Sequence, residues 1–232
     1  MPGDLVRYES PSGFATSMAI YQPASRPIGR ENDTLARTAT YFEGTWREES
    51  PMSDRIRVEQ CRFQKAKVAD TAWIAPGSVV LGDVCIGERS SIWYQTVIRG
   101  DVEQIRIGDD TNVQDLCMLH ADAGFPCILG NRVTVGHAAI VHGAIIEDDV
   151  MIGMRSVVMN GARIGRGSIV AVGAIVTEGT EIPPGSIAMG IPAKVKRIAE
   201  PRDQEKIRHA AEHYVAAARS HREACQPNSP HP

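Results

Sequence analysis

The 232-residue sequence lacks the features that mark several large classes of protein. It has no apolar run near the roughly 18 residues of a membrane span, and it does not begin with a basic stretch followed by an apolar segment. We therefore expect neither a membrane protein nor a secreted one, and we predict a cytoplasmic location. The net charge of -3 argues against nucleic acid or another polyanion as a partner. The five cysteines are scattered and form no Cys-x-x-Cys pair, which favours reduced thiols over disulfides.

The sequence does have an aliphatic residue at almost every sixth position from Val68 to Ile182, and no position of this repeat is polar. A helix with 3.6 residues per turn cannot keep such a repeat on one face, whereas short strands separated by corners can. The positions are Val68, Ile74, Val80, Ile86, Ile92, Ile98, Ile107, Val113, Leu119, Leu129, Val135, Val141, Ile146, Ile152, Val158, Ile164, Val170, Val176 and Ile182.

Three such hexads make one triangular coil, and stacked coils form a parallel β-helix in which the aliphatic positions point inward. The repeat gives roughly six coils, a continuous core in which each buried side chain contributes about 1.5–3 kcal/mol. The pattern does not set the hand, since parallel crossovers are normally right-handed. Hexapeptide-repeat proteins, which this sequence resembles, are left-handed. The expected fold is therefore all-β: a left-handed parallel β-helix of hexapeptide repeats with a C-terminal α-helix.

Composition and periodicity divide the chain into four parts. Residues 1–60 are polar and show neither the 3.6-residue period of a helix nor the two-residue alternation of a strand. We therefore expect a loosely ordered N-terminal extension. Residues 61–198 form the predicted β-helix domain. Residues 199–225 have one apolar helical face, which could lie against the prism or against a neighbour. Residues 226–232 are expected to be a disordered tail.

Places where the repeat slips lie beside three histidines. Counting hexads in threes places Arg99, His120 and His142 on one wall in successive coils, each directly after a core position. Because neighbouring strand residues alternate between the two faces, this column points outward from the prism. A second column, on another wall, holds Asp115 and His137.

Two histidines on one wall and a third near a corner of another cannot easily surround one ion within a single rigid prism. A neighbouring chain can complete the set, because three prisms around a threefold axis form three identical interfaces. Three neutral imidazoles with an open position for water make a catalytic zinc site. We therefore predict His120, His137 and His142 as metal ligands in a homotrimer. Zinc is the expected ion, and Fe²⁺ or Co²⁺ also suits imidazole ligands.

The stretch over residues 74–197, just over half of the chain, resembles the γ-class carbonic anhydrases, a family of left-handed β-helix proteins. The motifs that carry the resemblance are Ile74-Ala75-Pro76-Gly77, Arg99-Gly100-Asp101, Asn112-Val113-Gln114-Asp115, His120, Gly136-His137 through His142-Gly143, and Gly190-Ile191-Pro192-Ala193-Lys194. The resemblance implies a trimer-interface metal site with His120 and His142 from one chain and His137 from the next. It also implies a lyase, in which a metal-bound hydroxide reversibly hydrates CO2 to bicarbonate.

The resemblance further implies that Arg99 and Asp101 pair between subunits and that Gln114 orients the reacting water. Val102 departs from the pattern, because the most active archaeal members carry an acidic residue there. Asp122, the one carboxylate in the short turn after His120, is then the candidate for proton transfer.

Asn160 is the remaining candidate catalytic residue, one coil above the second histidine of the column. Turn chemistry is the more common reason for an asparagine at such a position. Corner capping is likewise the alternative explanation for Gln114, and an ordinary ion pair is the alternative for Arg99 and Asp101.

Two other functions remain open. An acyltransferase using acyl-CoA is built on the same prism, but it relies on a single histidine as general base, which three stacked histidines do not favour. A metal-binding protein without CO2 turnover, either thioesterase-like or an assembly subunit, would keep the histidines and act elsewhere.

Overall fold

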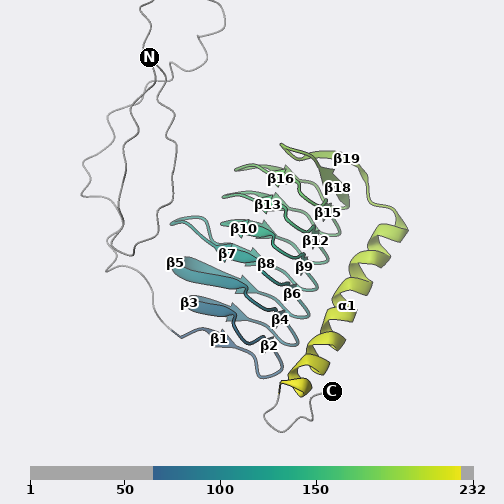
Figure 1. The fold of residues 1–232 in the computed structure, drawn as a ribbon. Coiled ribbons are helices and arrows are strands. Elements are labelled where there is room, and N and C mark those ends of the chain that lie inside the picture. Colours follow the sequence, from purple (N-terminus) through teal and green to yellow (C-terminus); the bar gives the residue numbers. More distant parts are fainter. Residues whose placement is uncertain (1–64, 226–232) are drawn as a thin grey trace, which may run out of the picture. The chain divides into compact units, whose positions relative to one another are not determined.

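The computed structural model describes residues 65–225, which fold as a left-handed parallel β-helix with one α-helix along its side (Figure 1). This is the fold class that the six-residue repeat and the resemblance predict. The expected extension over residues 1–60 and the expected tail over residues 226–232 lie outside the described residues.

Short parallel strands form the three walls of the prism. The strands are β1 Lys67–Val68, β2 Trp73–Ile74, β3 Val79–Ile86, β4 Ser91–Ile92, β5 Val97–Ile107, β6 Asn112–Val113, β7 Met118–His120, β8 Cys127–Leu129, β9 Thr134–Val135, β10 Ile140–His142, β11 Ile145–Ile146, β12 Met151–Ile152, β13 Val157–Val158, β14 Arg163–Ile164, β15 Ile169–Val170, β16 Ile175–Val176, β17 Glu181–Ile182, β18 Ser186–Met189 and β19 Lys194–Ile198. The long strands β3 and β5 bend around a corner, so two walls join in one 11-stranded sheet and the third wall is an eight-stranded sheet. Among the strands of residues 65–225, only β18 and β19 pair antiparallel, at one end of the prism.

The aliphatic repeat fills the prism. Ile98 and Leu119 lie in register on β5 and β7, and both are fully buried. Every repeat position from Ile86 onward is buried in the same way. The first three positions, Val68, Ile74 and Val80, are partly exposed, because among residues 65–225 only one neighbouring coil packs on this end.

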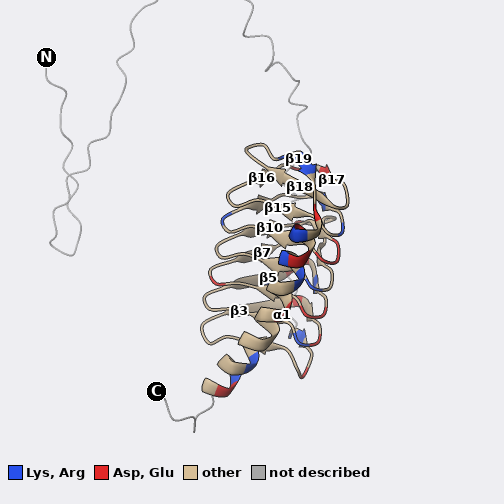
Figure 2. Cartoon of the chain, turned by 90° about the vertical axis from the view of Figure 1, so that its right-hand side faces the viewer, with Lys and Arg blue, Asp and Glu red and all other residues tan. Residues whose placement is uncertain are grey.

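The corner beside the helix carries alternating charges. Arg89, Asp110, Arg132 and Asp149 occupy equivalent positions in successive coils, all with left-handed backbone at φ 54 to 58°. Arg89 Nε lies 2.6 Å from Asp110 Oδ1, and Arg132 Nε lies 2.6 Å from Asp149 Oδ1. Figure 2 shows charge gathered at this corner, whereas the opposite edge is mainly uncharged. Because these pairs are exposed, they add little to stability.

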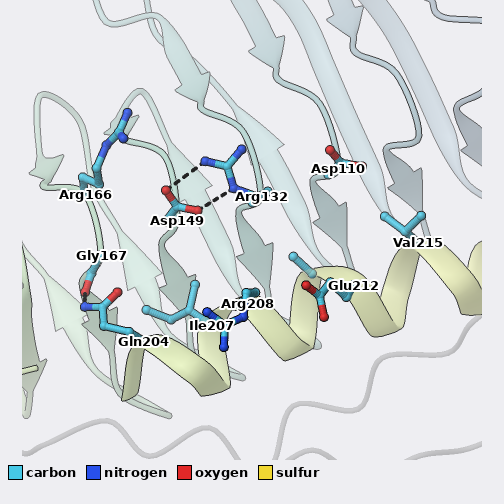
Figure 3. Close-up of a pocket in the computed structure, with 11 residues that line it drawn as sticks. Asp110, Arg132, Asp149, Arg166, Gly167, Gln204, Ile207, Arg208, Glu212 and Val215 are labelled. Atoms are coloured by element: carbon cyan, nitrogen blue, oxygen red, sulfur yellow. Dashed lines mark hydrogen bonds and ion pairs between the residues drawn. The ribbon is translucent and has the colours of Figure 1, made fainter. Parts of the chain in front are cut away.

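A cleft of about 600 Å³ separates this charged corner from the helix (Figure 3). It lies away from the predicted histidine column, and the ion pair between Arg132 and Asp149 forms part of its wall. The lining residues are Asp110, Arg132, Asp149, Arg166, Gly167, Gln204, Ile207, Arg208, Ala211, Glu212 and Val215.

Helix α1 (Pro201–Ala224) runs along the eight-stranded wall. It begins at the N-cap Glu200, whose backbone N–H donates to Asp203 Oδ2 at 2.8 Å. Its apolar face buries Ile207, Ala211 and Ala218, and the helix contacts β2, β4, β6 and β9. The apolar face therefore packs on its own prism. Among residues 65–225, no helix is both long enough and apolar enough to cross a membrane.

Candidate metal centre

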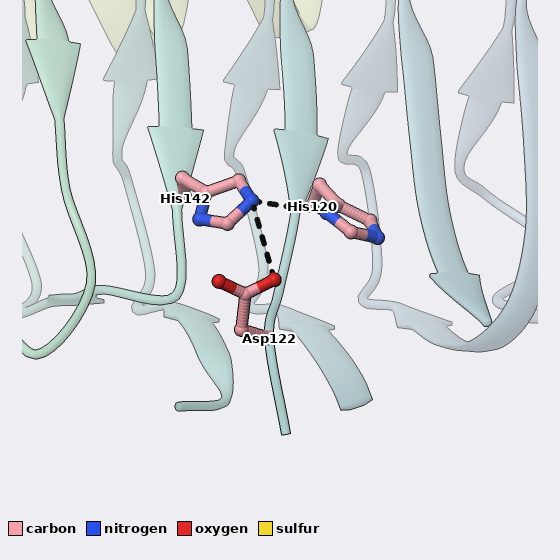
Figure 4. Close-up of side chains that lie close together, drawn as sticks. All are labelled: His120, Asp122 and His142. Carbon is pink, nitrogen blue, oxygen red and sulfur yellow. Dashed lines mark hydrogen bonds and ion pairs between the residues drawn. The ribbon is translucent and has the colours of Figure 1, made fainter. Parts of the chain in front are cut away.

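His120 and His142 lie side by side on one wall of the prism (Figure 4). Strands β7 and β10 pair in parallel with the two histidines opposite each other, and Arg99 on β5 is next in the same row. Nδ1 of His120 is 3.0 Å from Nε2 of His142. The structure thus contains the column inferred from the sequence. The extra residues that make the sequence spacing between Arg99, His120 and His142 irregular lie in the corners.

The second nitrogen of His120 is held by Asp101. Its Nε2 lies 3.2 Å from Asp101 Oδ1, and a carboxylate can only accept, so Nε2 carries the proton and Nδ1 keeps its lone pair. Burial lowers the pKa of His120, and the nearby Arg99 charge lowers it further. The pKa of Asp101 is also lowered: burial, the largest single effect, opposes ionisation, but the hydrogen bonds that the carboxylate accepts, from Arg99 first, together with the Arg99 charge, outweigh it. His120 is therefore held as a neutral imidazole, the form that binds metals.

The second nitrogen of His142 is held by a chain of two residues. Nδ1 of His142 is 2.8 Å from Asn160 Oδ1, and Asn160 Nδ2 donates to Asp122 Oδ2 at 2.8 Å. Because the Asp122 carboxylate can only accept, it fixes which end of the amide faces the imidazole. Nδ1 of His142 therefore carries the proton, and Nε2 keeps its lone pair.

Two lone pairs consequently face each other across 3.0 Å. Such an arrangement is repulsive unless a proton or a cation lies between the nitrogens. Asp122 Oδ1 is 3.9 Å from Nε2 of His142, and one ligand atom from each of these three residues lies within 4.8 Å of the other two. Two imidazoles whose remaining N–H groups are bound by acceptors have the form of a transition-metal site, so the residues present fit a divalent cation.

The short turn after β7 brings Asp122 to this site. It folds over Gly143, whose φ of +54° is left-handed. A Cβ on Gly143 would collide with Asn160 Oδ1 and would lie 2.9 Å from the Cβ of Phe125. The close contact between the turn and the next coil therefore requires glycine here.

His137 lies at a different corner, just after β9, and is not part of the group formed by the other two histidines. Its Nδ1 is 2.8 Å from Asp115 Oδ2, and its Nε2 is 3.4 Å from the hydroxyl of Tyr214 on α1. Its backbone N–H donates to Gln114 Oε1 at 3.1 Å. The structure thus places His137 as the sequence analysis expected, outside the reach of the other pair within one chain.

Arg99 and Asp101 pair within one chain, at 2.6 Å, where the resemblance implied a pair between subunits. They are two residues apart on β5, and side chains at that spacing point to the same face of a strand. Gln114 is 5% exposed and donates from Nε2 to Asn112 Oδ1 at 3.1 Å, so both ends of its amide are held.

Sequence reasoning missed two residues at the site. Tyr214 lies in the predicted C-terminal helix, and its contact with His137 spans 77 residues, which no local period reveals. Glu103 braces the turn by accepting the Gly124 N–H at 3.2 Å. Its position in an irregular part of β5 hid this role.

Comparisons with known proteins identify relatives of this chain. A family model described as bacterial transferase hexapeptide (six repeats) matches residues 65–100 and 143–178. The chain is 50% identical over 142 residues to a Methanocaldococcus jannaschii protein named "Probable carbonic anhydrase", covering 61% of this chain and 89% of that one. It is 36% identical to the Arabidopsis thaliana protein named "Gamma carbonic anhydrase 2, mitochondrial", covering 81% of this chain and 69% of that one. Among solved structures, a hexapeptide transferase family protein from Anaplasma phagocytophilum matches with a TM-score of 0.65 and 37% identity, covering 67% of this chain and 92% of that one.

The fold and the repeats define a left-handed β-helix protein of the hexapeptide-repeat class, here with paired histidines on one outer wall. Within that class, the chain belongs to the γ carbonic anhydrase family and is a carbonic anhydrase-like enzyme.

Proposed function

We propose that the chain is a metal-dependent carbonic anhydrase that reversibly hydrates CO2 to bicarbonate. The observation that carries this proposal is the geometry of His120 and His142. Nδ1 of His120 and Nε2 of His142 face each other at 3.0 Å, each with a lone pair, because acceptors bind the protons on the other two ring nitrogens. The relatives named carbonic anhydrase support the reaction. The substrate is a small molecule, and the expected location is cytoplasmic.

We propose that His137 of a neighbouring chain is the third ligand, in a homotrimer with one site at each interface. The wall with the histidines also carries an outward row of aliphatic side chains beside them: Val79, Val97, Met118, Ile140, Val157 and Ile175. At the corner that bears His137, Leu116 is 63% exposed and Val172 is 64% exposed. Exposed apolar side chains on both sides of the predicted junction favour an interface between copies of this chain.

A divalent cation supplies, when bound, a water acidic enough to attack CO2 at neutral pH, which is the established role of the metal in carbonic anhydrases. His120 and His142 would hold it through Nδ1 and Nε2. Zinc is the expected ion, and Fe²⁺ or Co²⁺ fits the same imidazoles.

The other polar residues have distinct roles in this proposal. Gln114, with its amide held at both ends, orients the reacting water. Asp122 is 56% exposed and lies 3.9 Å from His142, so it can accept a proton from the site and pass it to solvent. Asn160 keeps His142 in the ligating tautomer, and Asp101, held by Arg99, does the same for His120.

The test is purification without oxygen or chelator, followed by elemental analysis and a stopped-flow CO2 hydration assay on the same sample. We expect about one ion per chain and hydration above background, with both lost in His137→Ala. His209→Ala, which alters an exposed histidine of α1, is the matched control and should keep both. Wild-type protein that stays free of metal when Zn²⁺, Fe²⁺ or Co²⁺ is supplied would overturn the proposal.

The similarity to a hexapeptide transferase family protein supports an acyl-CoA transferase as the second candidate. Calorimetric titration with acetyl-CoA separates the two, because binding of acetyl-CoA by metal-free protein would favour the transferase. Bound metal with CO2 hydration at the background rate would instead favour a thioesterase-like protein or an assembly subunit.

A further inference from the structure

His137 is hydrogen-bonded at both ring nitrogens in the chain on its own. Asp115 Oδ2 accepts from Nδ1 at 2.8 Å, so the neutral imidazole, the form that binds a metal, has its lone pair on Nε2. The Tyr214 hydroxyl, 3.4 Å away, is the group that can donate to Nε2. The nitrogen that would face a metal is therefore in use within the chain.

Tyr214 is held in place by the docking of α1. Its ring packs edge-on against Trp93, with centroids 5.1 Å apart and an angle of 86° between the ring planes. Trp93 belongs to a cluster with Trp73 and His221 that joins the end of α1 to the wall. The phenol is therefore fixed by packing, and a phenylalanine at this position would keep that packing.

We propose that Tyr214 is a positioning residue that caps Nε2 of His137 until an ion takes its place. This rests on the proposed function, because it takes His137 as a metal ligand. An imidazole Nε2 has one lone pair, so it cannot accept from Tyr214 and bind a cation at once. Metal binding at the interface must break the contact, and the docking of α1 is thereby coupled to the loading of the site.

The test compares Tyr214→Phe with Tyr94→Phe in the full chain. Both variants remove a tyrosine–histidine hydrogen bond involving α1, but Tyr94 bonds to His221, at 2.9 Å, and not to His137. Removing the cap frees Nε2, so Tyr214→Phe should bind Zn²⁺ roughly 2- to 10-fold more tightly than wild type, the worth of one hydrogen bond. Tyr94→Phe should bind Zn²⁺ as wild type does. Unchanged or weaker binding in Tyr214→Phe would overturn the proposal.

Two NMR measurements give a readout that packing alone would not change. In metal-free protein, the ¹⁵N resonance of His137 Nε2 should move in Tyr214→Phe and stay in place in Tyr94→Phe. In wild type, Zn²⁺ should shift the ring-carbon resonance beside the Tyr214 hydroxyl, and it should not do so in His137→Ala. The second measurement needs no Tyr214 variant, so a folding failure of Tyr214→Phe leaves the proposal testable. A Tyr214 resonance that does not shift when Zn²⁺ is added to wild type would overturn the proposal.

Failure of the cap and failure of the metal site give different results. If His137→Ala binds Zn²⁺ as tightly as wild type, the third ligand has been misassigned and the proposed function fails. If His137→Ala loses Zn²⁺ while Tyr214→Phe matches Tyr94→Phe, only the cap fails.

Discussion

Replacing Asn160 by alanine tests how the site selects the tautomer of His142. The substitution removes the acceptor 2.8 Å from Nδ1 of His142 and the donor 2.8 Å from Asp122. Without that acceptor, the imidazole can place its proton on Nε2, the nitrogen that faces His120. Losing such a partner typically costs roughly 10- to 100-fold in metal affinity, or about 1.4–2.7 kcal/mol. We expect that loss in Asn160→Ala, measured by Zn²⁺ titration against a competing chelator.

The matched control is Asn131→Ala, at another corner of the prism. Asn131 Oδ1 accepts the Asp109 N–H at 2.8 Å, so both variants lose asparagine hydrogen bonds and should lose about 1 kcal/mol or more of unfolding free energy. Only Asn160→Ala should lose affinity for Zn²⁺. Equal Zn²⁺ affinities in the two variants would refute the tautomer argument.

Three further predictions concern the framework around the site. Leu119→Ala should lower the unfolding free energy in urea by about 2–5 kcal/mol, because Leu119 is fully buried in the stacked core; a loss near zero would contradict the assigned core. Gly143→Ala should weaken Zn²⁺ binding in the chelator assay, since its Cβ would push Asn160 away from His142, and wild-type affinity would show that the contact is not needed. The Arg197 guanidinium holds the pKa of Asp203 far below its usual value, so the unfolded chain binds the proton more readily. This contribution is present above about pH 4 and is lost as the pH falls further, so Asp203→Asn should show a smaller loss of stability than wild type in acid unfolding; equal losses would contradict this.

The fold was predictable because its determinant is local and repeated. An aliphatic residue at each repeat position indicates that this position is buried. A six-residue period is compatible with short strands and corners but not with a helix. The same counting aligned His120 with His142, since register in a β-helix follows from the number of hexads. The interruption between Ile98 and Ile107 corresponds to the register shift between β3 and β5 at Gly82 and Val84.

The parts of the site that could not be predicted depend on side chains that meet across the corners. The bond from His120 to Asp101 forms beside an irregular corner, whose path the period does not describe. The contact between Tyr214 and His137 depends on where α1 docks, and its amphipathic pattern left both the prism wall and a neighbouring chain as partners. Periodicity predicts the row of the prism wall in which a residue lies, but it does not predict which residues its side chain contacts.

The central claim is that one ion is shared by two chains, and mixing complementary variants tests it most directly. His137→Ala chains keep the paired histidines, and His142→Ala chains keep the third ligand, so neither forms a complete site alone. Unfolded together and refolded at equal amounts, they should recover one complete site in every mixed trimer, roughly a quarter of a site per chain. Zn²⁺ bound at that level only in the mixture is the predicted result. No recovery in verified mixed trimers, or full binding by either variant alone, would contradict the shared site.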